Sequence, residues 1–364
     1  MKRSVVVLGG YGTYGSLIAE QLTASGTQVI IAGRDAVKAE HFAGPLNADF
    51  ARCDVSDAVS LRQTILGAYL VINASGPFQA KDYAIPEACI EEGCHYIDLG
   101  DGRDYVAGIV QLHESAAARG VFICVGASTS PAITSAAAAD LRAGVGHIRS
   151  IKVALSAGNK NQAGVSTIAS ILAYVGAPVR VWRERRWQEE TGWGLGESVC
   201  FPEPVGRRRV QLCDVPDLEL FPELFEADSV VFKAGVELTL FNYAIKGLGA
   251  VRRLLPGLHL PVLAASMVRL SGLFRSFGTL HGSFGVWLSG DEGQERSISL
   301  VAPRNGPRIP SSPAILLARK LLDEGAPASG AFACVGFLSL KEFVDYLEPF
   351  GIFVVRGENG VWEE

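Results

Sequence analysis

The segment from Val5 to Gly15 constrains the fold more than any other feature of this sequence. It reads Val-Val-Val-Leu-Gly-Gly-Tyr-Gly-Thr-Tyr-Gly, so a β-branched apolar run passes through glycines into a helical pattern. Gly10, Gly12 and Gly15 fit the dinucleotide fingerprint, which needs a tight turn, a close backbone approach to pyrophosphate and a close helix–strand contact. A helix that begins near Thr13 would turn its free N–H groups toward the phosphates. The expected cofactor-binding residues of this loop are Gly9, Gly10, Tyr11, Gly12, Thr13, Tyr14 and Gly15.

The first half of the chain alternates short apolar runs with helical patterns. After the first strand, further strands are expected at 29–32, 50–53, 69–73, 95–99 and 121–125, with helices between them. This alternation is typical of a parallel, doubly wound Rossmann sheet. In such sheets ligands bind beyond the carboxyl ends of the strands, where the strand order reverses. The residues that follow each strand are therefore the first candidates for a site.

The residues after the second strand bear on the choice of cofactor. An NAD enzyme usually carries an acidic residue about 20 residues after the fingerprint, whereas this chain has Gly33 followed by Arg34. A guanidinium can hold a 2′-phosphate with two hydrogen bonds, so the sequence favours NADP over NAD. The alternative is that Arg34 is an exposed turn residue and that Asp35 caps the next helix.

Two further strand ends supply cofactor candidates. Asp54 and Val55 follow the third strand, where an adenine edge would be read, although an acid in a turn before a helix is an equally ordinary role. The fourth strand leads into Ala74, Ser75, Gly76 and Pro77, a small, backbone-rich loop that could lie against the ribose and nicotinamide. The alternative is a loop that the proline makes rigid.

Hydride transfer also requires a protein group that orients the acceptor and moves a proton. The candidates are Asp98 and Asp101 after the fifth strand, with Tyr83 near the exit of the fourth. Either carboxylate could anchor a substrate amine, or act as acid or base if burial raises its pKa. Alternatively, Asp98 caps backbone amides of the turn that follows it. The chain lacks a Tyr-x-x-x-Lys pair, a P-loop, a zinc-protease motif and a hydrolase elbow, and we expect no metal site.

Composition sets limits on domains and partners. At 364 residues, two domains are expected: a Rossmann domain over 1–130 and an α+β substrate and dimerisation domain over 131–364, whose C-terminal helices could pack back on the first. The net charge of -5 argues against nucleic acid as the main partner. No signal peptide is visible and the seven cysteines are scattered, which indicates free thiols in the cytoplasm.

Residues 238–277 form an apolar segment that prolines interrupt and that carries Lys246, Arg252, Arg253, Arg269 and Arg275. Pro256 and Pro261 leave no uninterrupted run of the ~20 apolar residues that a spanning helix needs. A basic helical hairpin could lie on a membrane surface. It could equally bury its apolar face in the protein or in a dimer interface. We expect burial, and a homodimer.

Several of these motifs, taken in order, resemble the saccharopine dehydrogenase-like family, and more narrowly its proteins with a saccharopine dehydrogenase NADP-binding domain. The motifs are Gly9 to Gly15, Ala32-Gly33-Arg34, Asn73 to Phe78 and Tyr96 to Asp101, all within about the first 130 residues. The resemblance implies a Rossmann domain, bound NADP(H) and a separate α+β domain that shapes the substrate site. Residues 126–132 depart from the Asp-Pro-Gly typical of true saccharopine reductases, so the substrate stays open.

These observations favour an NADP(H)-dependent oxidoreductase that transfers hydride to or from a C=N, C=O or C=C bond of a small or lipid-like substrate. One alternative is an NADP(H)-binding sensor or interaction protein that has kept the fold and lost the hydride chemistry. Another is a reductase that associates with a membrane surface through residues 238–277.

Overall fold

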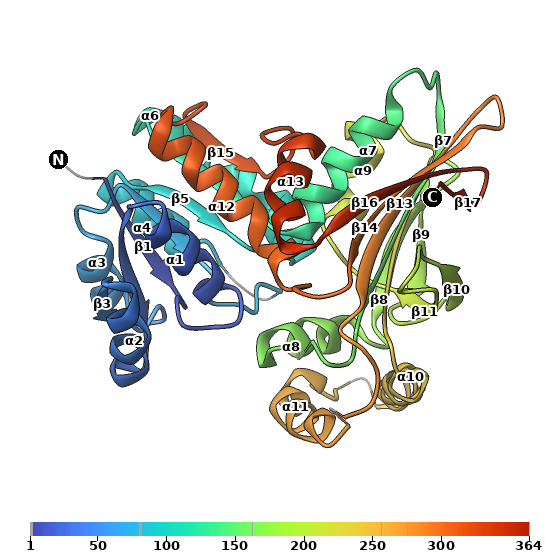
Figure 1. Cartoon of the computed structure of the whole chain (residues 1–364), viewed down its shortest axis with the longest axis horizontal. Coiled ribbons are helices and arrows are strands. Elements are labelled where there is room, and N and C mark those ends of the chain that lie inside the picture. Colours follow the sequence, from blue (N-terminus) through green and yellow to red (C-terminus); the bar gives the residue numbers. More distant parts are fainter. Residues whose placement is uncertain (1–2, 80–81, 162, 256, 275, 364) are drawn as a thin grey trace. The chain divides into compact units, whose positions relative to one another are not determined.

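The computed structural model describes residues 3–79, 82–161, 163–255, 257–274 and 276–363, so Pro256 and Arg275 lie outside the described ranges. The chain divides into two units, which Figure 1 shows in one colour ramp along the sequence. The first unit is Met1–Ala132 with Pro307–Leu338, and the second is Ile133–Gly306 with Ser339–Glu364. Residues 307–338 lie within the range 131–364 that the sequence predicts as the second domain, but they belong to the first unit. The prediction includes the option that C-terminal helices pack back on the first domain.

The first unit is built on a seven-stranded sheet with the order β15-β6-β5-β4-β1-β2-β3. All its strand pairs are parallel. The strand order reverses between β1 and β4, so the expected Rossmann sheet is confirmed. The strands are β1 (Ser4–Leu8), β2 (Gln28–Gly33), β3 (Asp49–Arg52), β4 (Leu70–Asn73), β5 (His95–Asp98), β6 (Phe122–Val125) and β15 (Gly330–Ala333).

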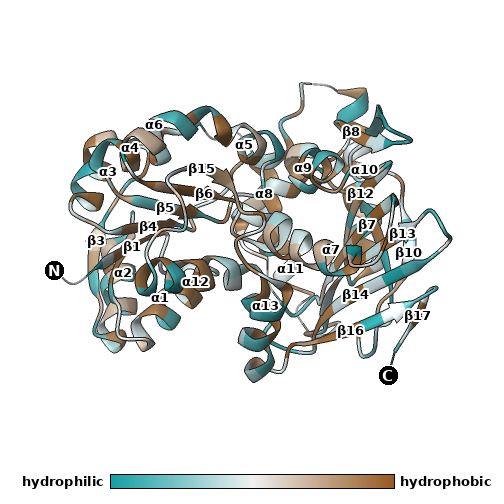
Figure 2. Cartoon of the chain, turned by 90° about the horizontal axis from the view of Figure 1, so that it is seen from above, coloured by the Kyte–Doolittle hydropathy of each residue, from teal (hydrophilic) through white to brown (hydrophobic). Residues whose placement is uncertain are grey.

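Helices cover both faces of this sheet. Figure 2 shows α3, α4, α5 and α6 along one face and α1, α2 and α12 along the other, with apolar strands between the two layers. Val5, Val6 and Val7 of β1 are fully buried because side chains on both faces of a central parallel strand meet a helix layer. The helices are α1 (Gly15–Ala24), α2 (Ala36–Ala43), α3 (Ala58–Ile65), α4 (Ala84–Glu92), α5 (Arg103–Ala107), α6 (His113–Ala118) and α12 (Arg308–Asp323).

The second unit contains a mixed ten-stranded sheet, whose main path is β10-β11-β12-β7-β13-β14-β16-β17, with β8 and β9 attached beside β12. Its strands are β7 (Ile148–Ala157), β8 (Pro178–Arg183), β9 (Arg186–Thr191), β10 (Glu197–Cys200), β11 (Arg207–Leu212), β12 (Ser229–Val236), β13 (Gly282–Gly290), β14 (Glu295–Ala302), β16 (Phe353–Glu358) and β17 (Val361–Trp362). Its helices are α7 (Thr134–Arg142), α8 (Val165–Tyr174), α9 (Asp217–Leu224), α10 (Thr239–Leu254), α11 (Ala264–Gly272) and α13 (Leu340–Leu347). Within this sheet, β13 and β14 pair as an antiparallel hairpin.

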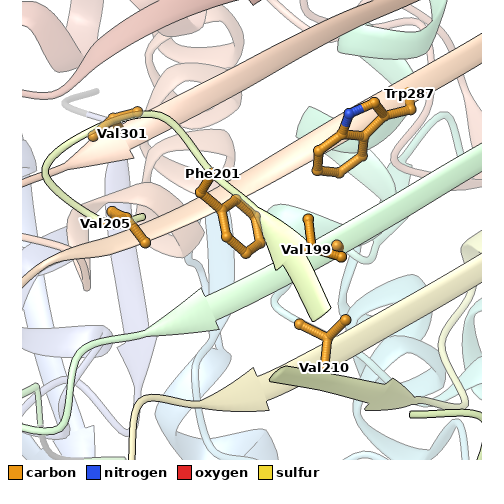
Figure 3. Packing of buried hydrophobic residues seen from close by; sticks show 7 residues of the cluster. Val199, Phe201, Val205, Val210, Trp287 and Val301 are labelled. Carbon is orange, nitrogen blue, oxygen red and sulfur yellow. The ribbon is translucent and has the colours of Figure 1, made fainter. Parts of the chain in front are cut away.

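One face of this second sheet is covered by an apolar cluster that joins β10, β11, β13 and β14 (Figure 3). Phe201 packs edge-on against Trp287, with ring centroids 6.1 Å apart, and Trp362 also packs edge-on against Trp287, at 5.7 Å. Aromatic pairs prefer such tilted arrangements, because the edge of one ring is attracted to the face of the other. This cluster fixes β10 and β17 onto the sheet.

The described residues of the segment 238–277 have both buried and exposed apolar side chains. α10 buries Asn242, Ile245 and Gly249 but exposes Leu240 and Leu254, the second of them 82% exposed. Within the chain itself, the apolar residues of this segment are therefore only partly buried, and burial in a dimer interface stays a prediction. Within those residues, none of the helices is both long enough and apolar enough to cross a bilayer.

Candidate functional site

The site begins at the glycine-rich turn between β1 and α1. Gly9 has a positive φ of 74°, which L side chains rarely adopt, and its amide donates to the Ala32 carbonyl at 2.8 Å. A side chain at Gly15 would collide with the Gly9 carbonyl and would place its Cβ 2.9 Å from the Gly10 α-carbon. These positions need glycine because the helix start packs directly on the turn. α1 begins at Gly15, two residues after the expected start, and no acidic side chain lies in its described first turn.

That turn is a cradle suited to a diphosphate. The first-turn amides of a helix have no intrahelical partner, and the helix dipole makes that end positive. A Cβ at Gly10 would lie 2.8 Å from the Val7 carbonyl oxygen, so the backbone there is also closely packed. The amide of Gly12 donates back to the Gly9 carbonyl at 2.9 Å, which closes the turn. The residues present therefore fit a dinucleotide.

Tyr11 covers the end of β2. A Cβ at Gly33 would lie 2.5 Å from the Tyr11 ring, so the ring sits directly against the Gly33 backbone. The Tyr11 hydroxyl accepts a hydrogen bond from the Asp35 amide at 3.0 Å. The position where an NAD-binding protein usually carries an acidic side chain is thus filled by an aromatic ring.

Beyond Tyr11, the edge of the sheet carries two arginines. Arg34 follows β2 and is exposed, and Arg52 ends β3 in register with Gly33. Hydrogen bonds from the Ser56 hydroxyl and amide lower the pKa of Asp54, and Arg34 and Arg52 add to this effect. Both cations are therefore close enough to act on one carboxylate. Arg52 was not among the residues singled out from the sequence, although it is a cation at a strand end.

Asp35 and Asp54 both have local partners. Asp35 caps α2, because its carboxylate accepts a hydrogen bond from the Lys38 amide at 3.1 Å. This hydrogen bond and the nearby Lys38 ammonium lower the pKa of Asp35. This is the alternative role that the sequence analysis left open for Asp35. The Asp54 carboxylate accepts from the Ser56 hydroxyl at 2.7 Å, and Val55 follows it, half-buried, in the turn before α3.

The loop after β4 approaches the glycine turn. A Cβ at Gly9 would lie 3.2 Å from both the Ala74 carbonyl carbon and the Ser75 amide nitrogen, so the two backbones are in near contact. The Asn73 amide oxygen accepts from the Ser75 amide at 3.0 Å and from its hydroxyl at 2.5 Å. Gly76 and Pro77 continue the loop through a cis peptide bond. The structure therefore brings the first and fourth strand ends together, as the fold topology predicts.

Asp98 lies at the centre of a buried network at the end of β5. Its two carboxylate oxygens accept four hydrogen bonds: from the Tyr96 hydroxyl at 2.9 Å, the Tyr105 hydroxyl at 2.6 Å, the Gly100 amide at 2.8 Å and the Gly126 amide at 3.0 Å. Burial raises the pKa of the Asp98 carboxyl above its usual range, and these four donors oppose that rise. The carboxylate joins the ends of β5 and β6.

The network continues to the loop after β4. The Asn73 side-chain amide donates to the Tyr96 hydroxyl at 3.1 Å, and its oxygen holds Ser75. Hydrogen bonds therefore run without a break from Ser75 through Asn73 and Tyr96 to Asp98. Asn73 is fully buried and was not recognised from the sequence as a site residue, because its role depends on side chains from the neighbouring strand.

The other two proton-transfer candidates lie beside this network. The Tyr83 hydroxyl donates to the Tyr105 carbonyl at 2.7 Å, and the two rings stack with centroids 5.1 Å apart. Burial raises the pKa of Tyr83. Asp101 is half-buried after β5 and accepts from the Gln79 side-chain amide at 3.0 Å. Through Tyr105 and the chain after β5, the structure brings Tyr83, Asp98 and Asp101 to the same end of the sheet.

Comparisons with known proteins agree with this geometry. Residues 5–124 match the family model of the saccharopine dehydrogenase NADP binding domain. The chain is 38% identical over 72 residues to a saccharopine dehydrogenase-like oxidoreductase of Rattus norvegicus, and 36% identical over 73 residues to one of Homo sapiens. These segments cover 20% of this chain and 17% of the length of each relative.

A solved structure resembles the chain over almost its whole length. Apo histidine-tagged saccharopine dehydrogenase (L-Glu forming) from Saccharomyces cerevisiae covers 98% of this chain, and the match spans 99% of that protein. The TM-score is 0.68 and the sequence identity 14%, so the likeness is one of fold. The expected resemblance to the saccharopine dehydrogenase family is confirmed over residues 5–124, which match the model of its NADP binding domain.

Proposed function

We propose that this protein is an NADP(H)-dependent oxidoreductase that transfers hydride to or from a C=N, C=O or C=C bond of a small or lipid-like substrate. The observation that carries the proposal is the exit of β2, where the Tyr11 ring fills the space beside Gly33. Because the Tyr11 ring lies against Gly33, that strand end offers Arg34 and Arg52 to a ligand in place of an acidic side chain. The two cations suit a 2′-phosphate, and the strand end carries no acidic side chain to accept the ribose hydroxyls of NAD.

The residues would divide the cofactor between them. The Gly10 and Gly12 amides already donate to the carbonyls of Ala32 and Gly9, so the other amides of the Gly10–Gly15 turn would hold the diphosphate. Arg34 with Arg52 would hold the 2′-phosphate. Ala74 to Pro77 would line the ribose and nicotinamide, since that loop meets the glycine turn at Gly9. When bound, NADPH would supply the hydride, and the protein would supply orientation and a proton.

We assign the proton transfer to Asp101. Asp98 already accepts four hydrogen bonds, and the Tyr83 hydroxyl is engaged with the Tyr105 carbonyl, so both residues are suited to positioning the strand ends. Asp101 is half-buried at the same end of the sheet and accepts a hydrogen bond from the Gln79 side-chain amide. A carboxylate in this position can accept or donate a proton at a substrate heteroatom.

The test is deuteride transfer from NADPH labelled at the nicotinamide C4 to a panel of imines, ketones and enoyl compounds, followed by mass spectrometry. We expect one substrate class to gain deuterium, and Asp101→Asn to lose turnover while it retains NADPH binding. NADPH binding without turnover on any class would favour the sensor. The sensor is the second candidate because Asp98 and Tyr83, two of the three residues expected to transfer a proton, are held in hydrogen bonds within the protein.

A further inference from the structure

We propose that residues 238–280 dock this protein on the surface of an anionic lipid bilayer. This inference is independent of the proposed reaction, because it depends on the second unit alone. The docking surface is defined by exposed residues of α10, α11 and the segments that flank them. Its apolar members are Leu240, Tyr243, Val251, Leu254, Leu255, Val262, Leu270, Leu273, Phe277 and Leu280.

α10 has a buried face and an exposed apolar face. One face packs inward through Asn242, Ile245 and Gly249. The other carries Leu240, Tyr243, Gly247, Val251 and Leu254, whose spacing of three, four, four and three residues places them in one stripe along the helix. Four of these five side chains are large, and all four are exposed, at 43% or more. A helix that only had to pack on its own unit would carry polar residues on that outer stripe.

The inner face is held firmly, so the outer stripe is presented in a fixed orientation. The Arg252 guanidinium donates to the carbonyls of Ala173 at 2.7 Å and Val175 at 3.1 Å, at the end of α8. A Cβ at Gly249 would lie 3.2 Å from the Gly176 amide nitrogen, so the two backbones are in close contact. Rotation of α10 to bury the outer stripe would break these contacts.

The apolar exposure continues through α11. Val262 precedes this helix and Leu273 follows it, and both side chains are at least 70% exposed. Leu270 and Phe277 are also exposed. The start of α10 is joined to the segment after α11 by Phe241 and Phe274, whose ring centroids are 5.2 Å apart. The start of α10 and the segment that follows α11 are therefore in contact.

The charge of this segment is of one sign. No aspartate or glutamate occurs from Leu238 to Gly290, in a chain whose net charge is -5. Lys246, Arg253 and Arg269 are exposed within the segment. On α10, Lys246 and Arg253 lie seven residues apart and flank the outer stripe on one side. Apolar side chains bordered by cations are the pattern of helices that lie in the plane of an anionic interface.

This charge argues for lipid rather than for a second copy of the chain. A two-fold dimer through this surface would bring the cations of both copies into one interface, to which the segment contributes no acidic side chain. Anionic headgroups would instead neutralise them, each contributing attraction that salt screens. The apolar side chains would then enter the boundary between headgroups and acyl chains, where Tyr243 and Phe277 are well suited.

The experiment is flotation of the full-length protein with vesicles of phosphatidylcholine alone or with 30% phosphatidylglycerol, at low and high salt. We expect binding to the anionic vesicles only, and its loss in high salt. Leu254→Ser should weaken binding about tenfold through lost apolar burial. Arg253→Glu should weaken it at least tenfold, since it reverses one charge near the surface.

Matched controls separate docking from general effects. Val37→Ser removes an equally exposed apolar side chain of α2, and Arg149→Glu reverses an exposed charge on β7; neither should alter flotation. A thermal melt of each variant shows whether it folds. Absence of flotation with anionic vesicles would overturn the proposal. So would a concentration-dependent dimer in sedimentation velocity that Leu254→Ser dissociates, because a second copy would then occupy the surface.

Discussion

The Tyr11 ring lies against the α-carbon of Gly33, and its hydroxyl accepts the Asp35 amide at 3.0 Å. These contacts join the glycine turn to the exit of β2. With the Tyr11 ring in this place, residue 33 has no room for a side chain larger than the hydrogen atom of glycine. The pair thus links the shape of the phosphate turn to the choice of cofactor.

Gly33→Asp should lower the free energy of unfolding by about 1–3 kcal/mol, because the new Cβ displaces the Tyr11 ring. In a Tyr11→Ala background the same substitution should cost less, and the double variant should bind NADH better than the wild type does. Chemical denaturation of all four proteins gives the coupling energy. An equal cost in both backgrounds would show that the ring is not the obstacle.

Arg34→Ala and Arg52→Ala should each weaken NADPH binding about tenfold, because a hydrogen bond between charged groups contributes about 1.5–3 kcal/mol. NADH binding should hardly change, since NADH lacks the 2′-phosphate. Isothermal titration calorimetry measures both affinities, with Arg149→Ala as the control for a lost exposed cation. Comparable losses for the two coenzymes would mean that these arginines do not read the phosphate.

Gly15→Ala should abolish NADPH binding, because its Cβ would collide with the Gly9 carbonyl and distort the turn. Gly247→Ala is the matched control: no atom lies within 4 Å of its Cβ position, and it occupies the interior of α10. That variant should gain about 0.5–1 kcal/mol of stability from helix propensity and bind NADPH as the wild type does. If Gly15→Ala also binds NADPH normally, the turn is not the phosphate site.

Tyr105→Phe should destabilise the protein by about 1.5–3 kcal/mol, since it removes a hydroxyl donor from a buried carboxylate. Asp98→Asn should cost more, because its amide group would face hydrogen-bond donors where the carboxylate accepted them. Urea denaturation gives both values. Wild-type stability in Asp98→Asn would rule out the network as a structural element.

Glu237 should make stability depend on pH in the acid range. Burial alone would raise its pKa, but the amides of Asn159 and Thr279, the Thr279 hydroxyl and Arg208 bring that pKa below its usual value. The carboxylate therefore stabilises the fold above the pKa of the unfolded chain, and this contribution is lost as pH falls through the folded pKa. Glu237→Gln should be less stable at pH 7 and should lose less stability on acidification. Parallel pH profiles for the two proteins would contradict this assignment.

The sequence allowed prediction of those parts of the site that depend on neighbours along the chain. The Val5–Gly15 turn and the strand ends at Asn73 and Asp98 follow from local patterns, because each strand and its turn are adjacent in sequence. The Tyr11–Gly33 contact depends on the conformation of one side chain. The place of Arg52 depends on the register of β3 with β2, which no local pattern specifies.

Two larger features of the fold could also not be predicted from the sequence. β15 pairs with β6, although about 200 residues separate them along the chain, so its place at the sheet edge could not be inferred from the strand order. For residues 238–277, the sequence indicated an apolar segment but not which side of α10 faces the unit. Asn242 and Gly249 form the buried side with Ile245, while more strongly apolar residues face outward.

The central claim is that the turn from Gly9 to Gly15 holds the diphosphate of NADP. Calorimetric titration of the full-length protein with NADPH and NADH tests it most directly. We predict saturable binding of NADPH, at least tenfold tighter than that of NADH, and no binding of NADPH to Gly15→Ala. An absence of heat and of thermal stabilisation with both coenzymes would contradict the claim.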